Sequence, residues 1–231
     1  MLSLNKIVSS YGETVILRGV DMEIGKGQVI ALMGRNGVGK STLLKTIMGL
    51  IRPRSGTIMF DGFDVTGLKP EERVRRGVGY VPQGREIFPY LTVYENLILG
   101  LEARGGKKNM IPDGIFDLFP ALKALLKRKG GDLSGGQQQQ LAIARVLITE
   151  PKLLLLDEPT EGIQPSIVFE IENTIRFIKN QGDISILLVE QFMEFALRLA
   201  DFCYIMEKGS IVFSGEVKDL SKDDIKDHLI I

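Results

Sequence analysis

One stretch of eight residues constrains the fold of this chain more than any other. It follows the apolar run 28–33, precedes the helix-like segment 42–48, and reads Gly34-Arg35-Asn36-Gly37-Val38-Gly39-Lys40-Ser41. A strand, a G-x-x-x-x-G-K-S loop and a helix in this order are typical of a phosphate-binding loop. The glycines allow amide N–H groups and the helix N-terminus to converge on one anion. The pattern therefore predicts an α/β fold with a phosphate site.

The side chains at the end of this loop have expected roles. Lys40 would reach the β- and γ-phosphates of a nucleotide, and the Ser41 hydroxyl would ligate Mg²⁺. Thr42 stands directly behind them at the start of the helix and is assigned to the same nucleotide-binding set. The alternative is a glycine-rich turn that binds nothing, which explains the loop but not the motifs that follow it.

Composition narrows the class of protein. Lysine and arginine (29) balance aspartate and glutamate (29), so no overall positive field favours nucleic acid as a partner. The single cysteine, Cys203, excludes an internal disulfide and a cysteine-based metal cluster. No apolar run approaches the roughly 20 residues of a membrane helix, and the N-terminus lacks the pattern of a secretion signal. We expect a cytosolic chain of one domain, or one domain with a small lobe.

The N-terminal residues predict antiparallel strands. Apolar and polar positions alternate over 1–30, and turn residues fall at 11–13 and 25–27. Tyr11, just ahead of the nucleotide fold, offers an aromatic face on which adenine can stack. The other interpretation of Tyr11 is a tyrosine that fills a hairpin turn.

A glutamine follows the next predicted core strand. Glycine and β-branched residues at 78–81 predict a buried strand, and Gln83 lies in the loop after it, at the edge where open α/β sheets bind ligands. Its amide would reach Mg²⁺ or a water near the γ-phosphate. Taken alone, Gln83 would be interpreted as a solvated loop residue.

The chain changes character between 88 and 145, where helical apolar spacing replaces strand patterns. The spacing predicts three helices, at 91–101, 115–126 and 138–148. A basic linker at 104–109 separates the first two. We interpret this region as a helical subdomain inserted into an α/β core of about 1–87 and 146–231. A polar tail at 217–228 predicts a short surface helix.

A second candidate anion site introduces the third predicted helix. Leu133 is followed by Ser134, Gly135, Gly136 and Gln137. A serine hydroxyl and glycine N–H groups at a helix start can hold a phosphate. The alternative is an ordinary N-cap with a glycine turn. One chain would thus carry two phosphate-binding segments in different subdomains.

Paired acids follow another buried strand. Leucines occupy 153–156, and Asp157 emerges at the strand end, where a carboxylate can hold Mg²⁺ directly or through water. Glu158 comes next and is placed to orient or deprotonate an attacking water. A polar turn is the alternative, which the upstream phosphate loop disfavours.

Together these motifs resemble those of the ATP-binding-cassette (ABC) ATPases. The family's Walker A loop, Q-loop glutamine, signature, Walker B acids and adenine-stacking aromatic correspond to 34–41, Gln83, 133–137, Asp157 with Glu158, and Tyr11. The resemblance implies one cassette over 1–231: a P-loop NTPase (RecA-like) core with an N-terminal antiparallel β subdomain and an inserted α-helical subdomain. It also implies that two cassettes enclose two ATP molecules with Mg²⁺, each between the Walker A loop of one cassette and the signature of the other.

Two positions depart from the family pattern, and both concern hydrolysis. After the strand 186–189 the family has a histidine that contacts the γ-phosphate, whereas this chain has Gln191, and its only histidine is His228 in the tail. The D-loop usually ends in aspartate, and here it ends in Gln164. A glutamine amide donates a hydrogen bond but carries no positive charge. We expect Glu158 to be the general base and Gln191 a neutral contact to the γ-phosphate.

The resemblance extends to a subfamily. The tripeptide 189–191 and the segment 80–89 resemble importers of the branched-chain amino acid type and their urea or short-chain amide relatives. Within that group, 34–40 and 158–165 are more similar to the urea branch. The resemblance therefore implies an ATPase that powers uptake of urea or short-chain amides, with branched-chain amino acid import as the alternative.

The resemblance also implies partners and a location. The partners are a second, different cassette, two transmembrane permease subunits and, indirectly, a solute-binding protein, at the cytoplasmic face of the cell membrane. A helix of the permease would dock near 83–90. A soluble cassette acting on nucleic acid or ribosomes usually has tandem cassettes or basic arms, which this sequence lacks. A regulatory subunit with negligible hydrolysis would explain Gln191 but not the retained Glu158.

Overall fold

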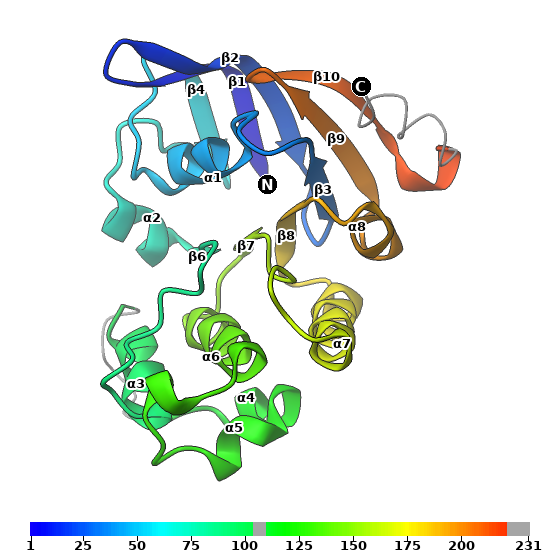
Figure 1. Ribbon diagram of the computed structural model, residues 1–231. Helices are drawn as coiled ribbons and strands as arrows, with labels where there is room; N and C mark the ends of the chain where they lie inside the picture. Colours follow the sequence, from blue (N-terminus) through cyan, green and yellow to red (C-terminus); the bar gives the residue numbers. More distant parts are fainter. Residues whose placement is uncertain (104–109, 221–231) are drawn as a thin grey trace.

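The computed structural model describes residues 1–103 and 110–220, which form two sheets and a set of helices (Figure 1). The predicted linker 104–109, most of the predicted tail helix and His228 lie outside the described residues. The first sheet is antiparallel and has the order β2-β1-β4-β5, with the strands β1 (Leu2–Tyr11), β2 (Thr14–Ile24), β4 (Ser55–Phe60) and β5 (Phe63–Asp64). The expected N-terminal antiparallel subdomain is confirmed.

The second sheet has six strands in the order β10-β9-β3-β8-β7-β6 and is parallel except at β10, which forms a hairpin with β9. Its strands are β3 (Val29–Met33), β6 (Val78–Val81), β7 (Leu153–Asp157), β8 (Ser185–Glu190), β9 (Phe202–Glu207) and β10 (Ser210–Glu216). The strands β3, β7 and β8 are buried along their whole length. Such strands need apolar side chains on both faces.

Alternate residues of the central strands enter two separate cores. Leu154 and Leu156 face the first core, against the helices, whereas Leu153 and Leu155 face the second core, between the two sheets. Successive side chains of a strand point to opposite faces. The four consecutive leucines are therefore explained by a sheet that is covered on both sides.

The helix that follows the phosphate loop, α1 (Lys40–Met48), packs in the second core beneath the antiparallel sheet (Figure 1). The other side of the six-stranded sheet is covered in the first core by α6 (Gly135–Leu147), α7 (Pro165–Gln181) and α8 (Met193–Leu199). The remaining α-helices of the described residues are α2 (Pro70–Arg76), α3 (Val93–Ala103), α4 (Asp113–Leu118) and α5 (Pro120–Ala124). None of the helices in the described ranges has the length and apolarity that crossing a bilayer requires.

The helical insert is confirmed, but one of its predicted helices is wrong. The segment 115–126 is not continuous, because Pro120 starts a new helix after α4. Phe119 has φ −130° and ψ 68°, since a residue before proline avoids the helical region. The helix expected at 138–148 begins earlier, at Gly135, and α6 runs across the predicted subdomain boundary at 145–146. That division of the chain stays a prediction.

Candidate nucleotide-binding site

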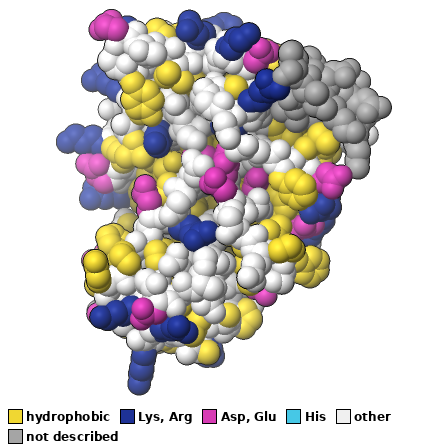
Figure 2. All heavy atoms as spheres, viewed as in Figure 1, with side chains coloured by type: hydrophobic (Ala, Val, Ile, Leu, Met, Phe, Trp, Pro, Cys, Tyr) yellow, Lys and Arg dark blue, Asp and Glu magenta, His cyan; other side chains and the backbone are white. Residues whose placement is uncertain are grey.

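Four loops meet at the carboxyl edge of the six-stranded sheet. The strands β3, β8, β7 and β6 are parallel neighbours, so the loops that follow them start side by side. The phosphate loop follows β3, Gln191 follows β8, and Gln83 lies in the loop after β6. Asp157 is the last residue of β7, and Glu158 comes directly after it. Figure 2 shows acidic side chains near the middle of this face, between the sheets and the helical subdomain. Ligands of open α/β sheets bind at this edge.

Glycines with positive φ angles and a buried lysine determine the conformation of the phosphate loop. Backbone φ angles are positive at Gly34, Gly37 and Gly39, a conformation that glycine adopts without steric cost. A Cβ on Gly34 would lie 2.4 Å from the Met206 carbonyl oxygen, so a larger residue does not fit. Lys40 is only 4% exposed, and its Nζ donates to the carbonyl oxygens of Gly34 (2.8 Å) and Arg35 (3.0 Å). Burial lowers the pKa of this ammonium, and a bound anion would offset that cost.

The other residues predicted to bind the nucleotide differ in how far they are exposed to solvent. Arg35, Asn36 and Gly37 are exposed at its tip, and Gly37 has open space where a Cβ would be. Val38 packs against the second core, so only its backbone can serve a ligand. Thr42 is buried inside α1. The loop thus fits a phosphate held mainly by backbone N–H groups and Lys40.

Ser41 and Asp157 place two oxygen atoms side by side at the edge of the sheet. The Ser41 hydroxyl donates to Asp157 Oδ1 (3.2 Å), and the Tyr80 hydroxyl donates to Asp157 Oδ2 (3.3 Å). Burial raises the pKa of Asp157, an effect that a cation beside it would reverse. Hydroxyl and carboxylate oxygens suit Mg²⁺, which keeps further positions for phosphate and water. Among the described residues, no group of three or more His, Cys, Asp or Glu side chains is arranged to hold a metal.

Glu158 is the residue on which the two predicted glutamines converge. Gln191 Nε2 donates to Glu158 Oε1 (2.9 Å), and Gln83 Nε2 donates to Glu158 Oε2 (3.3 Å). Lys40 Nζ lies 3.6 Å from Glu158 Oε1. Gln83 also donates to Glu161 Oε2 (2.9 Å), and within the described residues no hydrogen bond joins it to Asp157. Its predicted part in a Mg²⁺ site therefore stays a prediction, whereas its proximity to Glu158 is direct.

A buried acid beside Gln191 is not among the residues predicted from the sequence. Glu190 is 3% exposed and accepts hydrogen bonds from the Thr160 hydroxyl (2.8 Å), the Thr160 N–H (3.2 Å) and the Gln191 N–H (3.2 Å). Burial raises its pKa. Glu190 fixes the backbone of Gln191 and joins it to the segment after Glu158. Its position at the end of a buried strand, like that of Asp157, was the available signal.

Two predicted nucleotide contacts, Ser134 and Tyr11, form no hydrogen bond with this cluster in the described part of the chain. The Ser134 hydroxyl accepts from the Gln137 N–H (3.3 Å) and Gln137 Oε1 accepts from the Ser134 N–H (3.0 Å), which caps α6. Within the described part of the chain, no hydrogen bond connects 134–137 to the phosphate loop. Tyr11 ends β1 opposite Thr14 and is 50% exposed. A nucleotide in the phosphate loop would therefore need another surface to meet Ser134.

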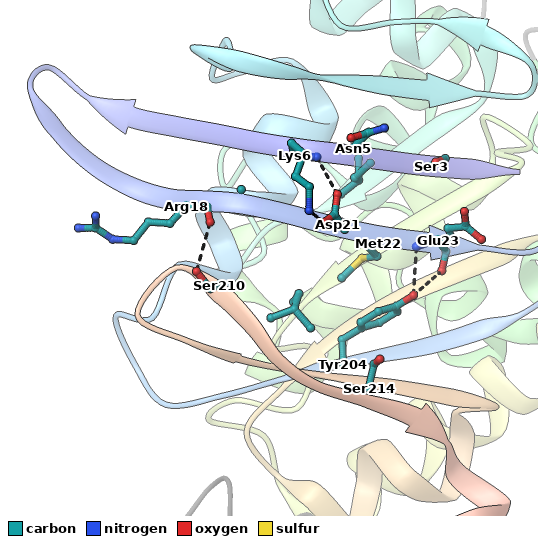
Figure 3. A pocket seen from close by; sticks show the side chains of 13 residues that line it. Ser3, Asn5, Lys6, Arg18, Asp21, Met22, Glu23, Tyr204, Ser210 and Ser214 are labelled. Atoms are coloured by element: carbon teal, nitrogen blue, oxygen red, sulfur yellow. Dashed lines mark hydrogen bonds and ion pairs between the residues drawn. The ribbon is translucent and has the colours of Figure 1, made fainter.

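A separate groove lies elsewhere on the molecule, and several of its polar groups already bond one another. It measures about 730 Å³ and lies between the strands β1 and β2 and the hairpin β9–β10 (Figure 3). Its polar groups bond one another: Lys6 pairs with Asp21, and the Tyr204 hydroxyl donates to the backbone oxygen of Glu23 (3.3 Å). None of the predicted site residues lines it. The convergence around Glu158, and not this groove, is the candidate site.

Comparisons with known proteins agree with this geometry. The family model described as ABC transporter matches residues 17–161. The high-affinity branched-chain amino acid transport ATP-binding protein BraG of Pseudomonas aeruginosa is 41% identical, over 92% of this chain and 91% of its own length. The probable branched-chain amino acid transport ATP-binding protein LivF of Archaeoglobus fulgidus is 40% identical, over 95% and 94%. Among solved structures, a dimeric ATP-binding cassette bound to ADP and Pi in a post-hydrolysis state superimposes with a TM-score of 0.85, at 26% identity, over 95% of this chain and 100% of that one.

Proposed function

Since this chain belongs to the ABC transporter family, we propose that it is the ATP-hydrolysing subunit of an importer for branched-chain amino acids. The chain has the fold of an ABC ATPase. The observation that carries the catalytic part of the proposal is the convergence of Lys40, Gln83 and Gln191 on Glu158. The choice of branched-chain amino acids as the solute is based on the names of the two relatives that are 40–41% identical.

In the proposed reaction, the residues of this chain bind, orient and accept a proton. Lys40 and the N–H groups of the phosphate loop hold the phosphates, while Ser41 and Asp157 hold Mg²⁺. Mg²⁺, when bound, neutralises charge on the phosphate oxygens. Glu158 accepts the proton of the attacking water. Its two oxygens are held by different glutamines, which restricts the rotation of its carboxylate.

Gln191 takes the position of the family's histidine in this proposal. Its amide is held by Glu158 on one side, and its backbone N–H by Glu190 on the other. A neutral amide contributes a hydrogen bond to the γ-phosphate without a charge. Lys40 is then the positively charged side chain that this chain itself brings to the cluster, and Glu158 remains the base.

The proposed active form pairs this cassette with a second one. Ser134 to Gln137 cap a helix on the other subdomain and do not bond the phosphate loop. A second cassette, arranged head to tail, would present its own signature to this phosphate loop and receive this one in return. The dimeric cassette with ADP and Pi supports such a pairing by similarity. We propose a different cassette as the partner, because Gln191 leaves this site without the histidine.

A groove between the core and the helical subdomain is the proposed docking site for a permease helix. It measures about 520 Å³ and is lined from α1, β6, α3 and α6. Leu50 (56% exposed), Phe88 (48%) and Leu99 (39%) give it apolar walls. Phe88 follows Gln83 along the same loop, so a helix seated here would press on the segment that contacts Glu158. This subunit would then lie at the cytoplasmic face of the membrane, with the solute-binding protein on the other side.

The solute expected from the sequence was urea or a short-chain amide, and the relatives favour the alternative. Both relatives named above are branched-chain amino acid proteins, and neither name mentions urea. The similarity of 34–40 and 158–165 to the urea branch lies in nucleotide-facing motifs, which do not contact the solute. Import of branched-chain amino acids is therefore the proposal, and the nucleic-acid alternative has no supporting relative among those described.

Uptake by cells tests the proposal. The gene is deleted in the organism that encodes it, and uptake of labelled leucine, isoleucine, valine and urea is measured. Restoring the wild-type chain should restore amino acid uptake, whereas the Lys40→Ala chain, which cannot hold phosphates, should not. Loss of urea uptake with normal leucine uptake would contradict the proposed solute, and normal uptake of all four would contradict the proposed role.

A further inference from the structure

An arginine connects the loop of Gln83 to the signature segment of the same chain. Arg85 is half-buried, and its Nη1 donates to Gln138 Oε1 (3.3 Å) at the start of α6. A Cβ on Gly135 would lie 3.1 Å from Nη1, so the guanidinium lies directly against the signature glycine. The second terminal nitrogen of the guanidinium, Nη2, lies 3.9 Å from a Cβ built on Gly162, which belongs to the D-loop.

The same loop is held at a second point along α6. Arg145, near the end of this helix, donates from Nη2 to the carbonyl oxygen of Glu86 (2.7 Å). Its guanidinium also stacks over the Phe88 ring, 5.3 Å from the centroid. The loop 83–88 is therefore attached to both ends of one continuous helix. A displacement of the loop has to move α6, or break one of these contacts.

The backbone of this loop is in a conformation that needs outside support. Arg85 has φ 72° and Glu86 has φ 46°. Residues with a side chain rarely adopt positive φ, and two in succession persist only where surrounding contacts hold them. The contacts of Arg85 and Arg145 with α6 are such support.

We propose that Arg85 is a positioning residue that transmits the state of this chain's own nucleotide site to its Ser134–Gln137 signature. Gln83 contacts Glu158 at one end of the loop, and Arg85 contacts Gln138 and Gly135 two residues further on. The inference rests on the proposed function, because the signature serves the nucleotide of a second cassette. With Arg85 in place, ATP at one site orients the signature that completes the other site.

Amide hydrogen exchange of the single chain tests this inference. Exchange is measured with and without Mg²⁺ and a non-hydrolysable ATP analogue. In the wild-type chain the analogue should slow exchange in 34–42 and also, by about fivefold or more, in 133–138. Arg85→Met should keep the first effect and lose the second. Gln138→Leu, which removes the acceptor and leaves Arg85 intact, should reproduce the loss. Arg75→Met, on the exposed face of α2, is the matched control and should behave as wild type.

The outcomes separate the inference from the proposed function. A purely structural role of Arg85 would change exchange in 133–138 equally with and without the analogue, which would overturn the inference. An unchanged response in Arg85→Met, or no response of 133–138 in the wild type, would also overturn it. Absence of slowing in 34–42 of the wild-type chain would instead show that the chain does not bind nucleotide, and the proposed function itself would fail.

Discussion

A buried arginine holds the C-terminal end of the phosphate-loop helix, and its removal is the stability prediction that the structure specifies best. Arg73 is 1% exposed, and no carboxylate within the described residues forms an ion pair with it. Its guanidinium donates to the backbone oxygens of Thr46 (2.9 Å), Ile47 (2.7 Å), Thr66 (3.0 Å) and Leu68 (3.1 Å). Two of these belong to the last turn of α1, where carbonyls lack the N–H of the residue four positions on, and the Thr46 oxygen also accepts from the Gly49 N–H (3.1 Å).

The expected cost of Arg73→Met follows from these contacts. Each hydrogen bond from a charged donor contributes about 1.5–3 kcal/mol. Desolvation offsets part of the sum, and burial accordingly lowers the pKa of Arg73. We therefore expect a net loss well below that sum, about 3–5 kcal/mol, because four backbone carbonyls lose a donor and no unpaired charge is left behind. For a chain of this size that corresponds to roughly 6–20 °C in Tm.

Urea unfolding followed by circular dichroism measures this loss. Arg75→Met is the control, because Arg75 lies on the same helix and is exposed; it should change the free energy of unfolding by less than about 0.5 kcal/mol. Arg73→Lys keeps the positive charge but not the planar guanidinium with its several donors, so its loss of unfolding free energy should lie between those of the other two variants. If Arg73→Met cost no more than Arg75→Met, the assignment of Arg73 as the support of α1 would be wrong.

Three further changes test individual parts of the site. Ser41→Ala should lower nucleotide affinity about tenfold in Mg²⁺, the equivalent of roughly 1.4 kcal/mol, and leave it unchanged in EDTA, as measured by titration with a fluorescent ATP. Gln191→Ala removes one hydrogen bond to a charged acceptor, about 1.5–3 kcal/mol, so ATP turnover should fall about ten- to 150-fold; a loss of ten-thousandfold would mean that this amide does more than hold its neighbours. Burial raises the pKa of Glu190 above its ordinary 4.5, so its contribution to stability is complete below pH 4.5 and is lost as the pH rises through the folded-state pKa. Glu190→Gln should therefore flatten the decrease in Tm between pH 4.5 and neutrality, and an unchanged slope in thermal denaturation would contradict a raised pKa.

The sequence was sufficient for residues whose position in the chain determines their position in the sheet. Asp157 and Gln83 lie at the ends of buried strands, and parallel strands bring their carboxyl ends to one edge, so the contacts of Asp157 with Ser41 and of Gln83 with Glu158 were predictable. The break at Pro120 was also readable from the proline alone, although helical spacing across it concealed the break.

Residues defined by distant partners could not be found in the same way. Arg73 lies in a segment rich in charge, which is typical of a surface helix, and it bonds carbonyls of two other segments, the end of α1 and residues 66–68. Glu190 is held by Thr160, thirty residues away. Arg85 reaches Gln138, 53 residues away. None of these pairs has a local spacing, because each depends on how separate elements pack.

The most direct test of the account is phosphate release by the purified chain with Mg²⁺ and ATP, alone and mixed with a histidine-bearing cassette of the same family. Activity in either condition should fall by about a hundredfold or more in Glu158→Gln, because the carboxylate that accepts the proton is replaced by an isosteric amide. The variant should keep wild-type affinity for ATP. Phosphate release by Glu158→Gln at the wild-type rate would contradict the central claim that Glu158, held by Gln83 and Gln191, is the base of an ATPase.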